Sequence, residues 1–113
     1  MFDAHCHLDR MNESLDAVLN RSRAAGVTHW MIAGVDPLGW ETQISLIQPG
    51  VSIGIGIHPW KITDNASETE RDLMKLESFV DEHKGRIRAI GETGLDFGKR
   101  IAAATHTNHA DTL

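Results

Sequence analysis

Along most of the chain, segments with an apolar residue at every second position alternate with segments whose apolar residues have helical spacing. This pattern predicts short strands separated by helices. The clearest strand is residues 51–57, where every second position is Val or Ile and the positions between them are Ser or Gly. Gly54 and Gly56 leave room for a close backbone approach on that face. Apolar and β-branched runs predict further strands over residues 2–8, 27–33 and 86–92.

The three segments between these strands carry apolar residues at helical spacing. The residues expected on the buried faces of these helices are Leu15, Val18, Leu19, Ala25, Trp40, Ile44, Ile47, Leu73, Leu76 and Val80. Strands that alternate with helices in this way are typical of a parallel sheet in an α/β protein. We therefore predict an α/β fold of four parallel strands.

Capping residues predict where these helices begin and end. Asn12 is the expected N-cap of a helix over residues 13–25, which Gly26 ends. Asp36 followed by Pro37 is the expected start of the second helix. Ser67 and Glu70 have the spacing of a capping box, which opens a third helix to about His83, and Gly85 then stops it.

The periodicity ends near Phe97. Residues 98–113 have little apolar content and no regular spacing, so we predict a divergent, irregular and disordered tail there. The folded domain is accordingly expected to cover residues 1–97.

Histidine and carboxylate side chains gather at one end of the predicted sheet. Asp3, His5 and His7 alternate onto one face of the first strand, so both imidazoles can reach one metal, with Asp3 nearby as a partner of a ligand. His58 ends the third strand and Glu92 ends the fourth. Functional groups of parallel barrels collect at the carboxyl ends of the strands. We therefore expect His5, His7 and Glu92 to converge there, where Glu92 can bridge two divalent cations.

Three other residue types have more than one interpretation. His58 can bind a substrate phosphate or line the site as a hydrogen-bond donor, although a lone histidine before proline is more often structural. Cys6 is expected to pack as a small buried hydrophobe on the opposite face of the first strand. The tryptophans Trp30, Trp40 and Trp60 are expected to pack in the core or at the rim rather than to stack on bases.

These motifs resemble the TatD family of metal-dependent deoxyribonucleases, within the amidohydrolase-like metal hydrolases. The matching stretches are Asp3-Ala-His5-Cys-His7-Leu-Asp9, Gly26-Val27, Gly56-Ile-His58-Pro59-Trp60 and Gly91-Glu92-Thr-Gly-Leu-Asp96-Phe97, in the order and approximate spacing of the family. The resemblance covers residues 1 to about 97.

The resemblance implies a TIM-type (β/α)₈ barrel, of which this chain would be the N-terminal half, and one or two divalent metal ions (Zn, Mn, Mg or Co). His5 and His7 would ligate the first metal, and Glu92 would bridge the ions as a catalytic residue. Asp96 would lie near the site, as a structural or substrate-positioning group. The metals would polarise a phosphodiester and activate a water molecule. The implied activity is that of a 3′–5′ exodeoxyribonuclease, with DNA as substrate.

Members of the family are more than twice as long as this chain, and the resemblance places two further histidines and an aspartate of the site on later strands. We therefore expect a truncated chain that is inactive or impaired. The alternatives are a non-catalytic metal-binding or self-associating fragment, and an amidohydrolase-like enzyme or D-aminoacyl-tRNA deacylase with another substrate. Four parallel strands leave two open edges, so a homodimer through these edges is also conceivable.

Charge and composition narrow the expected partners. The net charge of −5 argues against a general nucleic-acid-coating surface. Of the 11 Lys and Arg residues, eight lie in residues 57–113, either as a local phosphate-contacting region or, as we favour, as a solvated face. The sequence has no apolar run of the ~20 residues that cross a bilayer, no secretory signal at its start and one cysteine. These features predict a cytoplasmic protein without a membrane partner.

Overall fold

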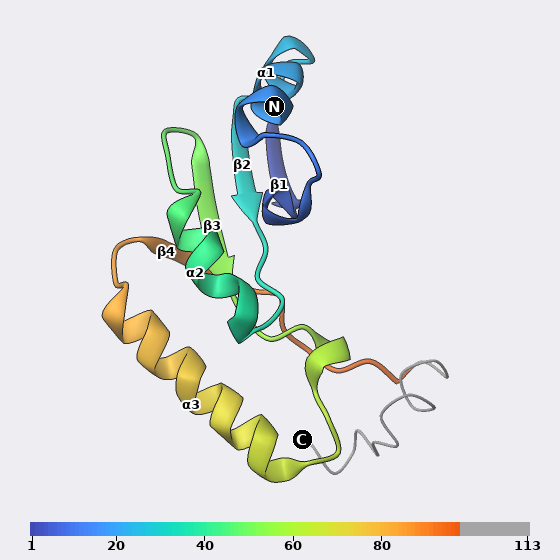
Figure 1. Ribbon diagram of the computed structural model, residues 1–113, viewed down its shortest axis with the longest axis vertical. Coiled ribbons are helices and arrows are strands. Elements are labelled where there is room, and N and C mark those ends of the chain that lie inside the picture. Colours follow the sequence, from blue (N-terminus) through green and yellow to red (C-terminus); the bar gives the residue numbers. More distant parts are fainter. Residues whose placement is uncertain (98–113) are drawn as a thin grey trace.

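The computed structural model describes residues 1–97, which form one parallel sheet with helices between its strands (Figure 1). The strands are β1 (Phe2–Cys6), β2 (His29–Ile32), β3 (Val51–Ile55) and β4 (Ile87–Ile90), and the helices are α1 (Leu15–Ala24), α2 (Pro37–Ser45) and α3 (Ala66–Glu82). Short 3₁₀ turns, η1 (Leu8–Arg10) and η2 (Pro59–Lys61), follow β1 and β3.

The strands pair in the order β1-β2-β3-β4, and every pair is parallel. This confirms the predicted α/β alternation, which is the architecture of the N-terminal half of a TIM-type barrel. The tail expected over residues 98–113 lies outside the described residues.

The helices begin at other residues than the capping pattern predicted. Ser14 caps α1, because its hydroxyl accepts the N–H of Ala17 (3.3 Å), so the prediction of Asn12 is wrong. Asn65 caps α3 by accepting the N–H of Glu68 (3.2 Å), which replaces the predicted capping box. Asn and Ser are similarly good N-caps, so the local sequence offered several starts of nearly equal free energy. Asp36 does precede α2, as expected.

The hydrophobic core lies between α1, α2 and one face of the sheet. It consists of Leu19, Trp30, Ile32, Trp40, Ile44, Val51, Ile53 and Ile55. The odd positions of β3 point into this core, as their alternation predicted. Trp30 and Trp40 are each only 2% exposed, which confirms the expectation that they pack in the core.

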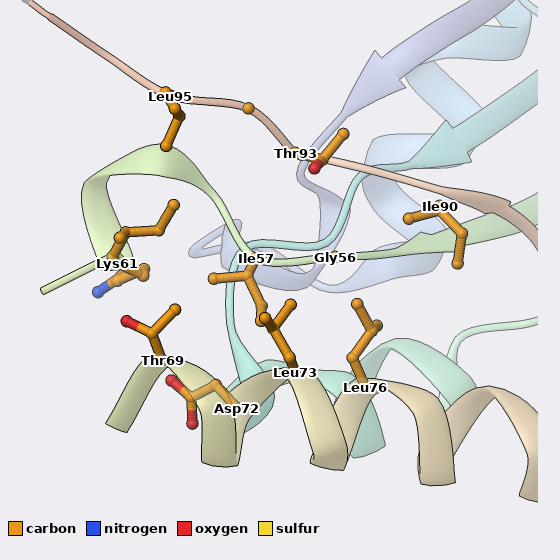
Figure 2. Close-up of a pocket in the computed structure, with 12 residues that line it drawn as sticks. Gly56, Ile57, Lys61, Thr69, Asp72, Leu73, Leu76, Ile90, Thr93 and Leu95 are labelled. Atoms are coloured by element: carbon orange, nitrogen blue, oxygen red, sulfur yellow. The ribbon is translucent and has the colours of Figure 1, made fainter. Parts of the chain in front are cut away.

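Helix α3 packs much less tightly than α1 and α2. None of its residues is buried, and Leu73 is 54% exposed, so the prediction of a buried Leu73 is wrong. Figure 2 shows Leu73 and Leu76 pointing toward Ile57 and Ile90 across a cavity of about 180 Å³. Helical periodicity indicates which side of a helix faces the sheet, but it does not say how closely the sheet approaches.

The sheet ends in β1 on one side and β4 on the other. Phe2 on β1 and Ile90 on β4 are each more than half exposed. The homodimer expected from these edges stays a prediction. Within residues 1–97, no helix combines the length and the apolar character needed to cross a bilayer.

Candidate metal centre

His5, His7 and Glu92 meet at the carboxyl end of the sheet. One ligand atom from each residue lies within 4.8 Å of the other two. The Nε2 atoms of His5 and His7 are 3.5 and 3.3 Å from the same carboxylate oxygen, Oε2 of Glu92. Within residues 1–97, this is the one group of three or more such side chains close enough to share an ion. The structure therefore brings together the three residues that the sequence suggested as ligands.

Glu92 approaches the histidines because the backbone after β4 crosses over glycines. The N–H of Gly34, just after β2, donates to the carbonyl of Gly91 (2.9 Å), and the N–H of Glu92 donates to the carbonyl of Gly34 (2.7 Å). A Cβ on Gly56 would lie 2.1 Å from the carbonyl oxygen of Glu92, and a Cβ on Gly34 would lie 2.7 Å from the Gly56 nitrogen. Any side chain at these positions would push the crossing segment away. The close approach predicted from the glycines of β3 is therefore present, and it positions Glu92.

Helix α2 supports this crossing from the other face of the sheet. The indole Nε1 of Trp40 donates to the carbonyl of Gly56, and Nε2 of Gln43 donates to the carbonyl of Gly54, both at 3.1 Å. Gln43 is buried, and sequence reasoning missed it. The available signal was its position three residues after Trp40, which places both side chains on one helical face.

His58 contacts Glu92 from a third direction. Its Nε2 is 3.3 Å from Oε1 of Glu92, the oxygen that is not shared by His5 and His7. Its Nδ1 accepts the backbone N–H of Trp60 (3.0 Å). A ring nitrogen that accepts a hydrogen bond carries no proton, so the neutral imidazole holds its proton on Nε2, facing the carboxylate. His58 therefore caps η2 through Nδ1, as a structural histidine would, and also lies against Glu92 through Nε2.

The two aspartates suggested from the sequence make different contacts. The Asp3 carboxylate accepts the backbone N–H of His5 (3.2 Å), and in residues 1–97 no hydrogen bond or ion pair joins it to an imidazole. The Asp96 carboxylate accepts the indole N–H of Trp60 (2.9 Å). Asp96 therefore contacts the indole of Trp60, whereas Asp3 contacts the backbone N–H of His5.

Cys6 is half-buried and packs against the hydrophobic core. Its Sγ donates to the carbonyl of Met31 (3.4 Å). Burial, and next the negative charge of Asp3, raise the pKa of the thiol from 9.0 to about 11. A thiol held neutral in this way is a poor nucleophile, which agrees with the expected packing role.

A pocket of about 330 Å³ opens beside these side chains. It is lined by His7, Arg10, Val35, His58, Trp60, Lys61 and Glu92. Arg10 and Lys61 bring positive charge to the pocket, and Lys61 also pairs with Asp36 (3.3 Å). Trp60 is 50% exposed here, unlike the two core tryptophans. Sequence reasoning did not select Arg10 or Lys61, because nothing in the local sequence separates them from ordinary surface cations.

The donor set at the carboxyl rim fits a divalent metal. Two imidazole nitrogens and one carboxylate oxygen suit Zn²⁺, Mn²⁺ or Co²⁺, whereas Mg²⁺ prefers more oxygen ligands. Two imidazoles directed at one carboxylate oxygen already form a compact group of ligand atoms.

Fold and site together define a parallel α/β half-barrel that carries a His-His-Glu group at the carboxyl ends of its strands. The sequence matches the TatD related DNase family over residues 2–110, and the chain belongs to this family. The resemblance seen in the sequence motifs is thereby confirmed.

The chain is similar to several characterised and uncharacterised proteins. It is 32% identical to human deoxyribonuclease TATDN3, over 90% of this chain and 40% of that protein. It is 30% identical to the 3′-5′ ssDNA/RNA exonuclease TatD of Pantoea vagans, over 97% of this chain and 42% of that protein. It is also 30% identical to the uncharacterized metal-dependent hydrolase YabD of Bacillus subtilis, over 86% of this chain and 38% of that protein. The chain thus spans about two fifths of the length of these relatives.

Proposed function

We propose that this chain contributes a divalent-metal site to a hydrolase that cleaves phosphodiester bonds in DNA from the 3′ end. The observation that carries the proposal is the convergence of His5, His7 and Glu92, whose ligand atoms lie within 4.8 Å of one another. The names of the relatives, a deoxyribonuclease and a 3′-5′ exonuclease, support the reaction and the direction.

Each side chain of the centre has a separate task in this proposal. His5 and His7 would hold the ion through ring nitrogens, and Glu92 would hold it through its carboxylate, whose Oε2 faces both rings. His58 lies against Oε1, with its Nε2 3.3 Å from that oxygen, and would help to hold the carboxylate in place. A bound divalent ion supplies a Lewis acid for the phosphodiester and lowers the pKa of a bound water to about 7.

The described residues hold part of the ligand set that the resemblance implies. The resemblance places three further ligands on later strands of the barrel, and residues 1–97 provide three ligands of a larger set. Metal binding is therefore the first measurement, and cleavage is the second.

The test is isothermal titration calorimetry with Zn²⁺ and with Mn²⁺ on the wild type and on His5→Ala and Glu92→Gln. We expect each substitution to weaken metal binding at least tenfold. Losing a group that only orients a ligand already lowers metal affinity tenfold or more, and each of these substitutions changes a ligand itself. His29→Ala is the matched control, since His29 is an exposed histidine at the start of β2. Equal affinity of the wild type and His5→Ala would contradict the proposal, as would an equal loss in His29→Ala.

Cleavage is then measured on a 5′-labelled single-stranded oligonucleotide, with Mg²⁺, Mn²⁺ or Zn²⁺. We expect the labelled product to shorten stepwise from the 3′ end, and to do so only in chains that retain His5. If His5→Ala cleaves as fast as the wild type, the cleavage does not come from this site.

A second candidate, a self-associating fragment, is favoured by one observation: the exposed Phe2 and Ile90 on the two edge strands. Size-exclusion chromatography with light scattering distinguishes the candidates, because association through these edges predicts a dimer that Ile90→Lys converts to a monomer.

A further inference from the structure

We propose that the pocket beside the metal centre is a nucleobase subsite, in which one base of a single-stranded nucleic acid stacks on Trp60 while a phosphate lies by Arg10. This subsite rests on the proposed function, because it places the base of a nucleotide whose phosphodiester lies at the metal centre.

The indole of Trp60 is both accessible and held in place. Half of the residue is exposed to solvent, although tryptophan is usually highly buried. Its Nε1 donates to Asp96 (2.9 Å), and its ring meets the His58 ring edge-on, with centroids 5.1 Å apart. An aromatic ring that is already fixed loses little conformational freedom when a ligand stacks on it. The arrangement therefore favours binding of a flat, apolar ring system.

Trp60 lies close to the metal centre, and both border the same pocket. His58 contacts Trp60 with one side of its ring and Glu92 with Nε2, so a single side chain separates the indole from the centre. His7, Glu92 and Trp60 line the same pocket of about 330 Å³. This volume lies within the range of about 300–1,000 Å³ that is common for small-molecule sites. A phosphate at the centre and its base on Trp60 can thus share one pocket.

The charge of the pocket favours a phosphorylated ligand. Lys61 is paired with Asp36, so much of its charge is already balanced. Arg10 also lines the pocket, and no carboxylate within residues 1–97 forms an ion pair with it. Arginine beside an exposed aromatic ring is the combination that binds single strands, whose unpaired bases have accessible faces. A base within a duplex has no such face to offer.

Binding of two labelled oligomers tests the subsite: hexathymidylate and a hexamer of abasic tetrahydrofuran nucleotides with the same number of phosphates. Fluorescence anisotropy is recorded in EDTA, where metal-dependent cleavage cannot proceed. We expect the wild type to prefer hexathymidylate. Trp60→Ala should weaken that complex about 5- to 150-fold, the usual loss for one stacked base, and leave the abasic complex unchanged.

Three further variants separate stacking from other effects. Trp60→Phe keeps a ring but loses the bond to Asp96, so it should retain most of the preference, while both Trp60 variants keep the backbone N–H that binds His58. Arg10→Gln should weaken both oligomers equally. Phe2→Ala is the control, since Phe2 is a 56% exposed aromatic residue at the other end of β1, and it should change neither affinity.

Equal binding of the two oligomers by the wild type would overturn the subsite. An equal loss for both oligomers in Trp60→Ala, or the same effect in Phe2→Ala, would also overturn it. If the chain prefers hexathymidylate but binds no metal in calorimetry, the result supports the nucleobase subsite and contradicts only the proposed hydrolysis.

Discussion

The centre of the sheet and its β4 edge differ sharply in packing. Strands β2 and β3 lie under α1 and α2, and Ile32, Ile53 and Ile55 are completely buried there. By contrast, β4 and α3 contain no buried residue, and Ile90 remains 54% exposed. Both regions have similar apolar spacing in the sequence. The difference arises because a central strand has neighbours on both sides, whereas within residues 1–97 β4 pairs only with β3.

The site joins the tightly packed centre of the sheet to its loosely packed β4 edge. His58 follows β3, which lies in the core, whereas Glu92 follows the exposed strand β4. A ligand that binds only the folded arrangement stabilises it, in proportion to the logarithm of ligand concentration over Kd. We therefore expect metal to stabilise mainly the β4 end, whose position relative to β1 depends on few other contacts.

The largest expected effect contrasts one core residue with one residue of α3. Ile53→Ala should lower the free energy of unfolding by about 2–5 kcal/mol, because it leaves a cavity in a fully buried site. Leu73→Ala removes a side chain that is 54% exposed and should cost about 1 kcal/mol or less. Urea unfolding followed by circular dichroism measures both. Equal losses would show that α3 packs as tightly as the core.

The second effect concerns the backbone crossing that positions Glu92. Gly56→Ala places a Cβ 2.1 Å from the Glu92 carbonyl oxygen and should displace this residue, lowering metal affinity at least tenfold. Gly39→Ala is the matched control: its Cβ would meet only Asp9, at 3.8 Å, and alanine is favoured in α2. Calorimetry that finds the same metal affinity in both variants would mean that the glycine crossing does not control the position of Glu92.

The smallest effect tests how far the core protects the edge strand β1. The pKa of Cys6 is raised from 9.0 to about 11 in the folded chain, so alkylation by iodoacetamide should remain slow up to about pH 10. The urea-unfolded chain should react with a midpoint near the ordinary value. Between pH 9 and 11 the unfolded chain loses a proton that the folded chain keeps, so the free energy of unfolding should fall as pH rises. Identical pH profiles for folded and unfolded chains would show that Cys6 is not protected.

The sequence by itself determined the order of the elements and the rim at which the chemistry lies. The alternation of residues 51–57 and the helical spacing between strands follow from local geometry, so they survive in any packing of the chain. Parallel strands have their carboxyl ends together, so the positions of His5, His7, His58 and Glu92 at or just after strand ends were enough to place them at one end.

Only the tertiary structure decided which of these groups touch. Three strand spacings separate β1 from β4 in the sheet, so the contact of Glu92 with His7 requires the crossing over Gly34 and Gly56, which involves backbone atoms distant in sequence. The proton position on His58 is set by the Trp60 N–H, and the exposure of Trp60 and Leu73 is set by the distance to neighbouring segments. Periodicity encodes the direction of a side chain, whereas contact depends on how closely separate elements approach.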